Sequence, residues 1–460
     1  MMRTTRADVL LRTCAAGVSL IAVAVLVSFA LASAAFSVSC TRDEAGRQRA
    51  SGGRTTIALV GWGAPEEEQV LREVIAAFEQ GHPNVHVQYT QVPGVGYDYL
   101  NKLRLMLIAG APPDVFYVPD GAFGELVRTG ALLDLERFVA ASRVIDLDAM
   151  WATAIARYRW NGRRLEEGDL FALPKDLGPT VLFYDADRLR ARGLPLPDSR
   201  EPMTWSEAVA MWHALTDDEG GVHRYGITSF PYEDAVWSSG EEVLSPDRRS
   251  WNLTSPVAIR AVQWCADLAL KEHVAPNPTR LGDQGGGGRE LFEARLAAMH
   301  IDGRWMVPRF RQLDFDWDVA PIPVPERGAP SIGWSGSVGL AISSRSPSPH
   351  EAFALVEYLA GPEGQARLTA TGLQLPNQRN VALTNLFLQR DRRPRHAEVF
   401  VMAAESSRPA PATLVPNAFW HDVFSSFAEE VWRGDRTAAS LFPEIAPRID
   451  QALRSRNPEP

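Results

Sequence analysis

Thirteen tryptophans are the most distinctive chemical resource of this chain of 460 residues. Several of them lie beside glycine or proline in predicted loops, where packing in a hydrophobic core is a weaker explanation. Flat aromatic rings can cover the apolar faces of a sugar ring, while carboxylates, amides and arginine side chains bind its hydroxyl groups. These residue types therefore suit the recognition of a polyhydroxylated ligand.

Trp62 and Asp120 each follow a predicted strand. The β-branched run at 56–60 ends in Gly-Trp-Gly, and the run at 114–118 leads into Pro-Asp-Gly. Open α/β sheets bind their ligands beyond the carboxyl ends of the strands. Trp62 therefore either contacts a ligand or packs within its own domain, and Asp120 either accepts hydrogen bonds from two hydroxyl groups or forms a turn.

Trp237 is a further candidate for ligand contact, in the sequence Val-Trp-Ser-Ser. Four other tryptophans fall within helical patterns, and we interpret them as core residues. These four are Trp151, Trp160, Trp212 and Trp264.

Strands and helices are expected to alternate from residue 56 onward. Strands are predicted at 56–60, 85–89 and 114–118, separated by one helix that begins at Pro65 and another over 97–109. This order indicates parallel strands joined by right-handed crossovers, and so an α/β fold. Further along the chain we expect a strand at 180–184, a helix start at 204–207 and a helix over 291–299.

Several classes of function are disfavoured by composition and motifs. The net charge of -9 repels phosphate backbones, so we expect no nucleic-acid partner. There is no His-Glu-x-x-His zinc motif, and residues 333–337 (Gly-Trp-Ser-Gly-Ser) lack the last glycine of a Gly-x-Ser-x-Gly elbow. A glycoside hydrolase needs two carboxylates about 5 to 10 Å apart, and no such pair is evident in the sequence. We therefore expect neither enzyme activity nor a metal or cofactor, with a secreted glycoside hydrolase kept as the alternative.

The amino-terminal segment carries an export signal. Three arginines precede an uncharged stretch at 13–41 that has an apolar centre, which predicts a signal over residues 1–39. Cleavage is expected either beside Ala34 or just before Cys40, and in the second case Cys40 becomes the lipid-bearing first residue. Alternatively the stretch stays uncut as an anchor, since about 20 apolar residues span a bilayer. All of these readings place the remainder of the chain outside the cytoplasm.

Residues 40–54 have no apolar period and are predicted to be a tether that carries the body away from the membrane. Cys265 lies in a helical pattern and has no partner if Cys40 is lipidated. We therefore expect no disulfide framework, and a buried, inert thiol at Cys265.

Ordered segments over residues 55–450 resemble the family of ABC-type extracellular solute-binding proteins, which includes maltose- and other sugar-binding proteins. Each segment is weak alone, but their shared order is specific. The segments are Phe-Glu at 78–79, His-Pro at 82–83, Val-His-Val at 85–87, Ile-Ala-Gly at 108–110, Pro-Asp-Val at 113–115, Gly-Ala-Leu-Leu-Asp-Leu at 130–135, Ala-Leu-Pro-Lys-Asp at 172–176, Leu-Phe-Tyr at 182–184, Met-Thr-Trp at 203–205, Met-His-Ile-Asp-Gly-Arg-Trp at 299–305, Trp-Asp-Val-Ala-Pro-Ile-Pro at 317–323 and Gly-Trp-Ser-Gly at 333–336.

The resemblance implies the two-lobed periplasmic-binding-protein fold, with two discontinuous α/β lobes, a hinge of crossing strands and a ligand in the cleft between the lobes. We place lobe one at 55–179 plus 338–385 and lobe two at 181–336 plus 386–460. Hinge residues are then expected near Thr180 and Ser337.

The resemblance also implies four more ligand contacts. Trp305 matches a tryptophan that stacks on ligand in the family, and Trp420 lies close to a stacking segment of maltose-binding proteins. Asp176 resembles a position where the family often places a polar contact, although a loop carboxylate paired with Lys175 is equally expected. Trp334 lies in the Gly-rich segment at the second crossover.

The function implied by the resemblance is the extracytoplasmic solute-binding component of an ABC importer. Such a protein binds a carbohydrate or polyol as a monomer and delivers it to the transmembrane permease subunits. A sensor that presents its ligand to a membrane receptor has the same fold and is a further alternative. Sugars, polyols and sugar phosphates all remain open as the ligand.

Overall fold

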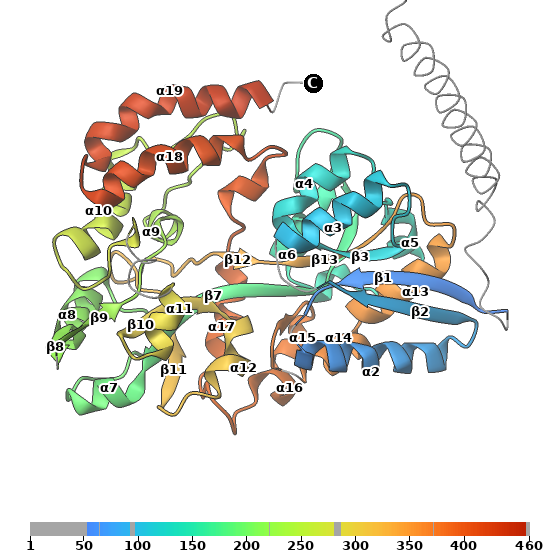
Figure 1. Ribbon diagram of the computed structural model, residues 1–460, viewed down its shortest axis with the longest axis horizontal. Coiled ribbons are helices and arrows are strands. Elements are labelled where there is room, and N and C mark those ends of the chain that lie inside the picture. The colour runs from blue at the N-terminus through green and yellow to red at the C-terminus, as the bar shows by residue number, and fades with distance from the viewer. Residues whose placement is uncertain are drawn as a thin grey trace, which may run out of the picture. The chain divides into compact units, whose positions relative to one another are not determined.

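The computed structural model describes residues 53–63, 65–92, 97–219, 221–279, 287–370 and 372–456. Cys40 and the predicted export signal lie outside these ranges, as does most of the predicted tether. Residues Ile57–Pro460 form one compact unit. Two separate sheets organise it, and we call the parts built on them the first and the second lobe (Figure 1).

The first lobe is built on a five-stranded sheet with the order β2-β1-β3-β13-β6. Strands β1 and β3 are parallel, with Leu59 opposite Val115, as the alternation of strands and helices predicts. Its elements are β1 (Thr55–Gly61), α2 (Pro65–Gly81), β2 (Val85–Gln91), α3 (Tyr97–Ile108), β3 (Val115–Pro119), α4 (Asp120–Arg128), α5 (Glu136–Ala141), α6 (Ala152–Ala156), β4 (Arg159–Trp160), β5 (Asp169–Leu170), β6 (Ala172–Pro174), β13 (Val338–Ile342), α13 (Pro349–Ala360) and α14 (Pro362–Thr369).

The second lobe is built on a sheet with the order β11-β7-β10-β9-β8. Its elements are β7 (Asp176–Asp185), α7 (Ala186–Ala191), α8 (Trp205–Leu215), β8 (Asp217–Glu219), β9 (Val222–Ile227), α9 (Tyr232–Ser238), α10 (Pro256–Leu270), α11 (Gly288–Glu293), β10 (Ala297–Gly303), η3 (Arg304–Met306), α12 (Val307–Phe310), β11 (Trp317–Ala320), β12 (Ser335–Gly336), α17 (Glu398–Ser406), η4 (Pro411–Leu414), α18 (Phe419–Arg433) and α19 (Ala438–Arg456).

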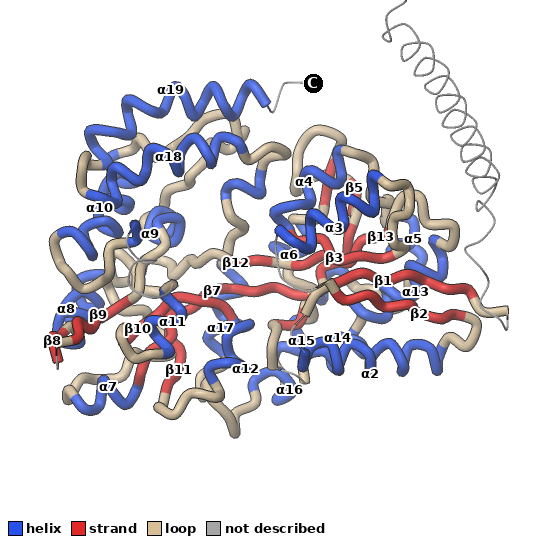
Figure 2. The backbone as a smooth tube through the Cα atoms, in the orientation of Figure 1, coloured by secondary structure: helices blue, strands red, loops and turns tan. Residues whose placement is uncertain are grey.

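Two of the segments that connect the lobes run between the sheets beside each other (Figure 2). Strand β7 pairs at its start with β14 (Leu375–Pro376) and β12, and farther on with β10 and β11 of the second sheet. The other segment is 333–338, which we call the crossing segment. It contains β12 and leads directly into β13 of the first sheet. The predicted hinge positions, Thr180 and Ser337, lie in these two segments, while the exact edges of the lobes remain a prediction.

Three apolar clusters form the core. One lies around the first sheet, and a second packs beneath α18, α19 and α10. The third cluster lies beside β7 and brings together α12, α17 and the short helices α15 (Arg379–Ala382) and α16 (Asn385–Leu388). Trp151 belongs to this third cluster, so its interpretation as a core residue is confirmed at 2% exposure.

Local signals located most of the elements. Helix α8 begins with a capping box in which Thr204 and Glu207 each accept the other's backbone N–H, as the sequence predicts. The predicted helix over 291–299 is wrong, because the helix ends at Glu293 and β10 begins at Ala297. Arg295 takes a left-handed φ of 58°, and Met299 then pairs with Tyr184, so sheet pairing overrides the local pattern.

Cys265 is a buried free thiol on α10, as expected. Burial raises the pKa of Cys265 well above its ordinary value, which disfavours the reactive thiolate. Within the described ranges, none of the helices combines the length and the apolar character that a membrane span requires.

Candidate ligand-binding site

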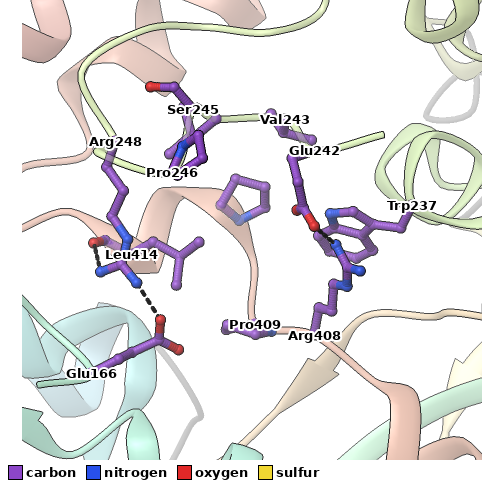
Figure 3. A pocket seen from close by; sticks show the side chains of 12 residues that line it. Glu166, Trp237, Glu242, Val243, Ser245, Pro246, Arg248, Arg408, Pro409 and Leu414 are labelled. Carbon is purple, nitrogen blue, oxygen red and sulfur yellow. Dashed lines mark hydrogen bonds and ion pairs between the residues drawn. The ribbon is translucent and has the colours of Figure 1, made fainter. Parts of the chain in front are cut away.

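A pocket of about 370 Å³ lies where three distant parts of the chain meet (Figure 3). One wall comes from the first lobe, one from the loop after α9 in the second lobe, and one from the segment that leads through η4. The lining residues are Glu166, Trp237, Glu242, Val243, Leu244, Ser245, Pro246, Arg248, Arg408, Pro409, Pro411 and Leu414. The volume lies in the range of roughly 300–1,000 Å³ that is usual for small-molecule sites.

Arg248 joins the two lobes at one end of this pocket (Figure 3). Its guanidinium forms an ion pair with Glu166 and donates to the carbonyl oxygens of Leu165 and Leu414, each at 2.9 Å. Arg164 of the first lobe adds a hydrogen bond to the carbonyl oxygen of Pro246 at 2.9 Å. The pocket is therefore closed on this side by contacts between the lobes.

The backbone at this junction is strained. Glu166 and Arg248 have φ angles of 67° and 59°, in the left-handed region that residues other than glycine rarely adopt. Such conformations cost of order 1–3 kcal/mol each and persist only where the surroundings enforce them. The ion pair and the carbonyl hydrogen bonds form at these residues, so the strain and the contacts between lobes occur at the same two positions.

A second ion pair lies at the other end of the pocket, between Arg408 and Glu242. The Arg408 guanidinium also lies 5.9 Å from the centroid of the Trp237 ring. Trp237 is on α9 and only 2% exposed, yet it lines the pocket. The structure therefore brings this sequence candidate to a cavity, with arginine and glutamate beside it.

The crossing segment connects the pocket with the other sequence candidates. Its Gly333 and Ser335 form backbone hydrogen bonds with Arg408 of the pocket wall. The backbone N–H of Trp334 donates to the Asp234 carboxylate at 2.8 Å. Asp234 lies on α9 with Trp237, so one helix supports both tryptophans.

Asp234 is completely buried, and its second carboxylate oxygen has no hydrogen-bond partner. Burial, with Glu233 nearby, raises the pKa of Asp234 well above its ordinary value. The Asp234 side chain therefore has a positioning role toward the crossing segment.

Asp120 lies just beyond β3, as predicted, and is the first residue of α4. One carboxylate oxygen accepts the N–H of Gly121 at 2.8 Å, and the other pairs with Arg157 at 2.7 Å. Arg157 is buried and also donates to the carbonyl and the hydroxyl of Ser335, both at 2.5 Å. Burial raises the pKa of Asp120, although the Arg157 guanidinium opposes this. The arrangement fixes the crossing segment to the first lobe and leaves ligand contact by Asp120 as a prediction.

Asp176 is the first residue of β7, where the chain leaves the first lobe. Its carboxylate accepts the N–H of Val338 at 3.0 Å, and its carbonyl accepts the Ser337 hydroxyl at 2.7 Å. Lys175 lies beside it at 3.3 Å and also pairs with Glu67 at 2.9 Å. The alternative of a carboxylate paired with Lys175 is therefore realised. Asp176 also links the start of β7 to the crossing segment.

Trp305 and Trp334 lie edge to face, with ring centroids 5.8 Å apart and planes at 72°. Two glycines make room for the Trp305 ring. A Cβ atom on Gly178 would lie 2.7 Å from a Trp305 ring carbon, and one on Gly303 would lie 2.1 Å away. Both rings are only partly buried, so the pair sits at β7 and the crossing segment with part of its surface accessible.

Trp62 and Trp420 pack against the apolar clusters of their own lobes. Trp62 packs edge to face against Tyr99 and Tyr117, with centroids 4.6 and 5.3 Å away, which favours packing within the first lobe. Trp420 is 0% exposed in the core beneath α18. Full burial of the Trp420 ring favours packing in the core over the predicted ligand contact.

Four charged residues of the pocket were not predicted from the sequence. Glu166 and Arg248 are 82 positions apart, and Glu242 and Arg408 are 166 apart. No local motif marks any of them. The only usable signal was the abundance of arginine, and that has no positional meaning. Among the described residues, no group of His, Cys, Asp and Glu has the arrangement of a metal site.

Comparison with known families identifies one match. The model of the family described as bacterial extracellular solute-binding protein matches residues 64–366. Among curated proteins, the chain is 26% identical over 328 residues to an uncharacterized lipoprotein in the oleD 5' region of Streptomyces antibioticus, covering 68% of each chain. It is 22% identical over 373 residues to the galactooligosaccharide-binding protein of Bacillus subtilis, covering 79% of this chain and 82% of that one.

Solved structures show the same fold. An ABC substrate-binding protein from Listeria monocytogenes in complex with cycloalternan has a TM-score of 0.73 at 21% identity, covering 87% of this chain and 99% of that one. The sugar-binding protein MalE from Xanthomonas citri has a TM-score of 0.71 at 23% identity, covering 87% and 98%. The two-lobed α/β architecture predicted from the sequence is thereby confirmed.

Proposed function

Because the chain belongs to the bacterial extracellular solute-binding protein family, we propose that it captures a carbohydrate outside the cytoplasm and delivers it, as a monomer, to an ABC permease. One observation carries the choice of ligand. The pocket in Figure 3 combines a tryptophan and three prolines with two arginine–glutamate pairs drawn from both lobes. Apolar walls with a few fixed polar groups match the alternating faces and hydroxyl edges of a sugar.

The relatives support the same ligand class. The similar proteins include a galactooligosaccharide-binding protein and a multiple sugar-binding protein. The pair formed by Trp305 and Trp334 offers a further aromatic surface at the crossing segment. We assign ligand contact to Trp237, Trp305 and Trp334, and positioning of the crossing segment to Asp120 and Asp176.

A carbohydrate panel tests this function directly. The purified body of the protein is screened by thermal shift against mono-, di- and oligosaccharides, because a ligand at 100 times its Kd adds about 2.7 kcal/mol to stability. Labelled oligosaccharides that give a shift are then incubated with the protein and recovered. A binding protein returns them intact, whereas cleavage products would establish the glycoside hydrolase alternative. No shift with any carbohydrate would count against the proposal.

Ligand binding is proposed to bring the lobes together about β7 and the crossing segment. A ligand that touches both lobes binds the closed form better, and only this difference in affinity shifts the equilibrium. The Arg248–Glu166 ion pair and the Arg164 hydrogen bond join the lobes beside the pocket. They support a closed form that is stabilised by the protein's own contacts as well as by the ligand.

Small-angle scattering is expected to show a smaller radius of gyration when a confirmed carbohydrate ligand is added. Arg248→Met should enlarge the ligand-free particle and weaken binding by about 1 kcal/mol, since it removes a partly buried ion pair and two hydrogen bonds. The control is Arg433→Met, which removes a similar ion pair on the exposed end of α18. An unchanged radius of gyration in every state would reject closure and favour a rigid site.

Anchoring through Cys40 is part of the proposal. The mature chain is expected to begin at a diacylated Cys40, motivated by the small-residue run that ends there. Mass spectrometry of protein extracted from membranes measures the mass of the amino-terminal peptide. An unmodified terminus near Ala35 would instead establish a freely exported protein without a lipid anchor.

A further inference from the structure

The charges that line the pocket cancel. Its charged lining residues are two arginines and two glutamates, and each arginine is already paired with one of the glutamates. The pairs lie at opposite ends of the pocket (Figure 3). A ligand between them therefore meets no uncompensated positive charge from these walls.

Both terminal nitrogens of the Arg248 guanidinium are also occupied. One terminal nitrogen donates to the Leu165 and Leu414 carbonyl oxygens, and the other faces Glu166. Arginine recognises phosphate by presenting a free fork of N–H groups to two anionic oxygens. At Arg248 an anionic ligand would have to displace the Glu166 carboxylate from the guanidinium, and at Arg408 it would have to share the guanidinium with Glu242 and lie beside that carboxylate.

An uncharged polyol meets neither obstacle. Its hydroxyl groups can donate to the outer oxygens of Glu166 and Glu242 and accept from the remaining N–H groups of Arg408. Its apolar faces can lie against Trp237 and the proline-rich wall that includes Pro409. Both ion pairs stay intact while the ligand binds.

Building on the proposed function, we propose that this pocket selects an uncharged carbohydrate or polyol and discriminates against phosphorylated ligands, with Glu166 and Glu242 as the selectivity residues. These two glutamates come from different lobes, so both are in place only when the pocket is closed. Selectivity against phosphate is then greatest in the form that holds the ligand.

The test uses matched probes that differ only by a phosphate group. Glucose is compared with glucose 6-phosphate, and glycerol with glycerol 3-phosphate, beside any neutral carbohydrate that the panel identifies. Binding is measured by calorimetry for the wild type, Glu166→Gln, Glu242→Gln and the double variant. Glutamine keeps the size of the side chain and its ability to accept from arginine, so folding is expected to persist and is checked by thermal melts.

The double variant is expected to bind the two phosphorylated probes about tenfold more tightly than the wild type (~1.4 kcal/mol), since two arginines lose their counter-charges. Affinity for neutral probes should stay the same or fall. The control is Glu429→Gln, which removes the glutamate of an exposed arginine pair on α18 and should change neither affinity.

Two outcomes would overturn the inference. One is a wild type that binds a phosphorylated probe as tightly as its neutral partner, and the other is a double variant that gains no affinity for phosphate. The proposed function is judged separately by the carbohydrate panel. If no carbohydrate binds but the double variant gains phosphate affinity, the sugar-binding function fails while the charge argument stands.

Discussion

Lys175→Met is expected to lower the free energy of unfolding by about 3–5 kcal/mol, because it leaves the carboxylates of Glu67 and Asp176 without a counter-charge at a buried position. Lys175 is only 4% exposed, and its ammonium group donates to Glu67 at 2.9 Å and to Gln374 at 2.6 Å. Asp176 lies 3.3 Å away. Methionine fills a similar volume but leaves both acids without a counter-charge.

The pKa values agree with this assignment. Burial by itself would lower the pKa of Lys175, but Glu67 and Asp176 together raise it above its ordinary value, so the ammonium stays charged in the folded protein. Burial raises the pKa of Asp176 even though Lys175 opposes the shift. Without Lys175 the pKa of Asp176 should rise further. The variant should therefore lose less stability at acidic pH, where Asp176 binds a proton, than at neutral pH.

Chemical denaturation of Lys175→Met at neutral and acidic pH measures both effects. The matched control is Lys271→Met, since Lys271 also pairs with an aspartate, Asp267, at 2.7 Å but is exposed to solvent. That pair should contribute at most about 1 kcal/mol. Adding Glu67→Gln to Lys175→Met should restore part of the loss. Equal, small losses in the two lysine variants would show that the buried network does not stabilise the fold.

Much of the fold was predictable because its signals are local. The strand before Trp62 and the capping box at Thr204 each depend on a few neighbouring residues. The failed helix over 291–299 shows the limit. Nothing nearby in the sequence reveals that Met299 will lie opposite Tyr184, since that pairing joins residues more than a hundred positions apart.

The site was predictable only in part, for the same reason. A tryptophan can be recognised by type, so Trp237, Trp305 and Trp334 were identifiable as candidates, but so was Trp420, which the structure buries completely. Residue type does not reveal which face of a helix turns inward when both faces of α18 carry aromatic residues. The charged residues of the pocket are harder to predict from the sequence. Arg248, for example, lines the pocket through hydrogen bonds to Leu165 and Leu414, which are distant from it in the chain.

Trp305→Ala is expected to weaken carbohydrate binding by at least about 1 kcal/mol, roughly fivefold, while changing the melting temperature much less than a core substitution does. The ring of Trp305 is partly buried, and lies edge to face with Trp334 beside the crossing segment. Under the proposed function it covers one face of a sugar, and its loss removes apolar contact without emptying the centre of the core.

The control for Trp305→Ala is Trp420→Ala, which has the same change in size at a fully buried position of the same lobe. Emptying that core site should cost about 3–5 kcal/mol of stability and affect affinity mainly through the fold. Calorimetry with a confirmed carbohydrate and thermal melts of both variants separate the two effects. If Trp305→Ala instead loses as much stability as Trp420→Ala and binds normally once folded, Trp305 is a packing residue. The aromatic surface of the site would then consist of Trp237 and Trp334 alone.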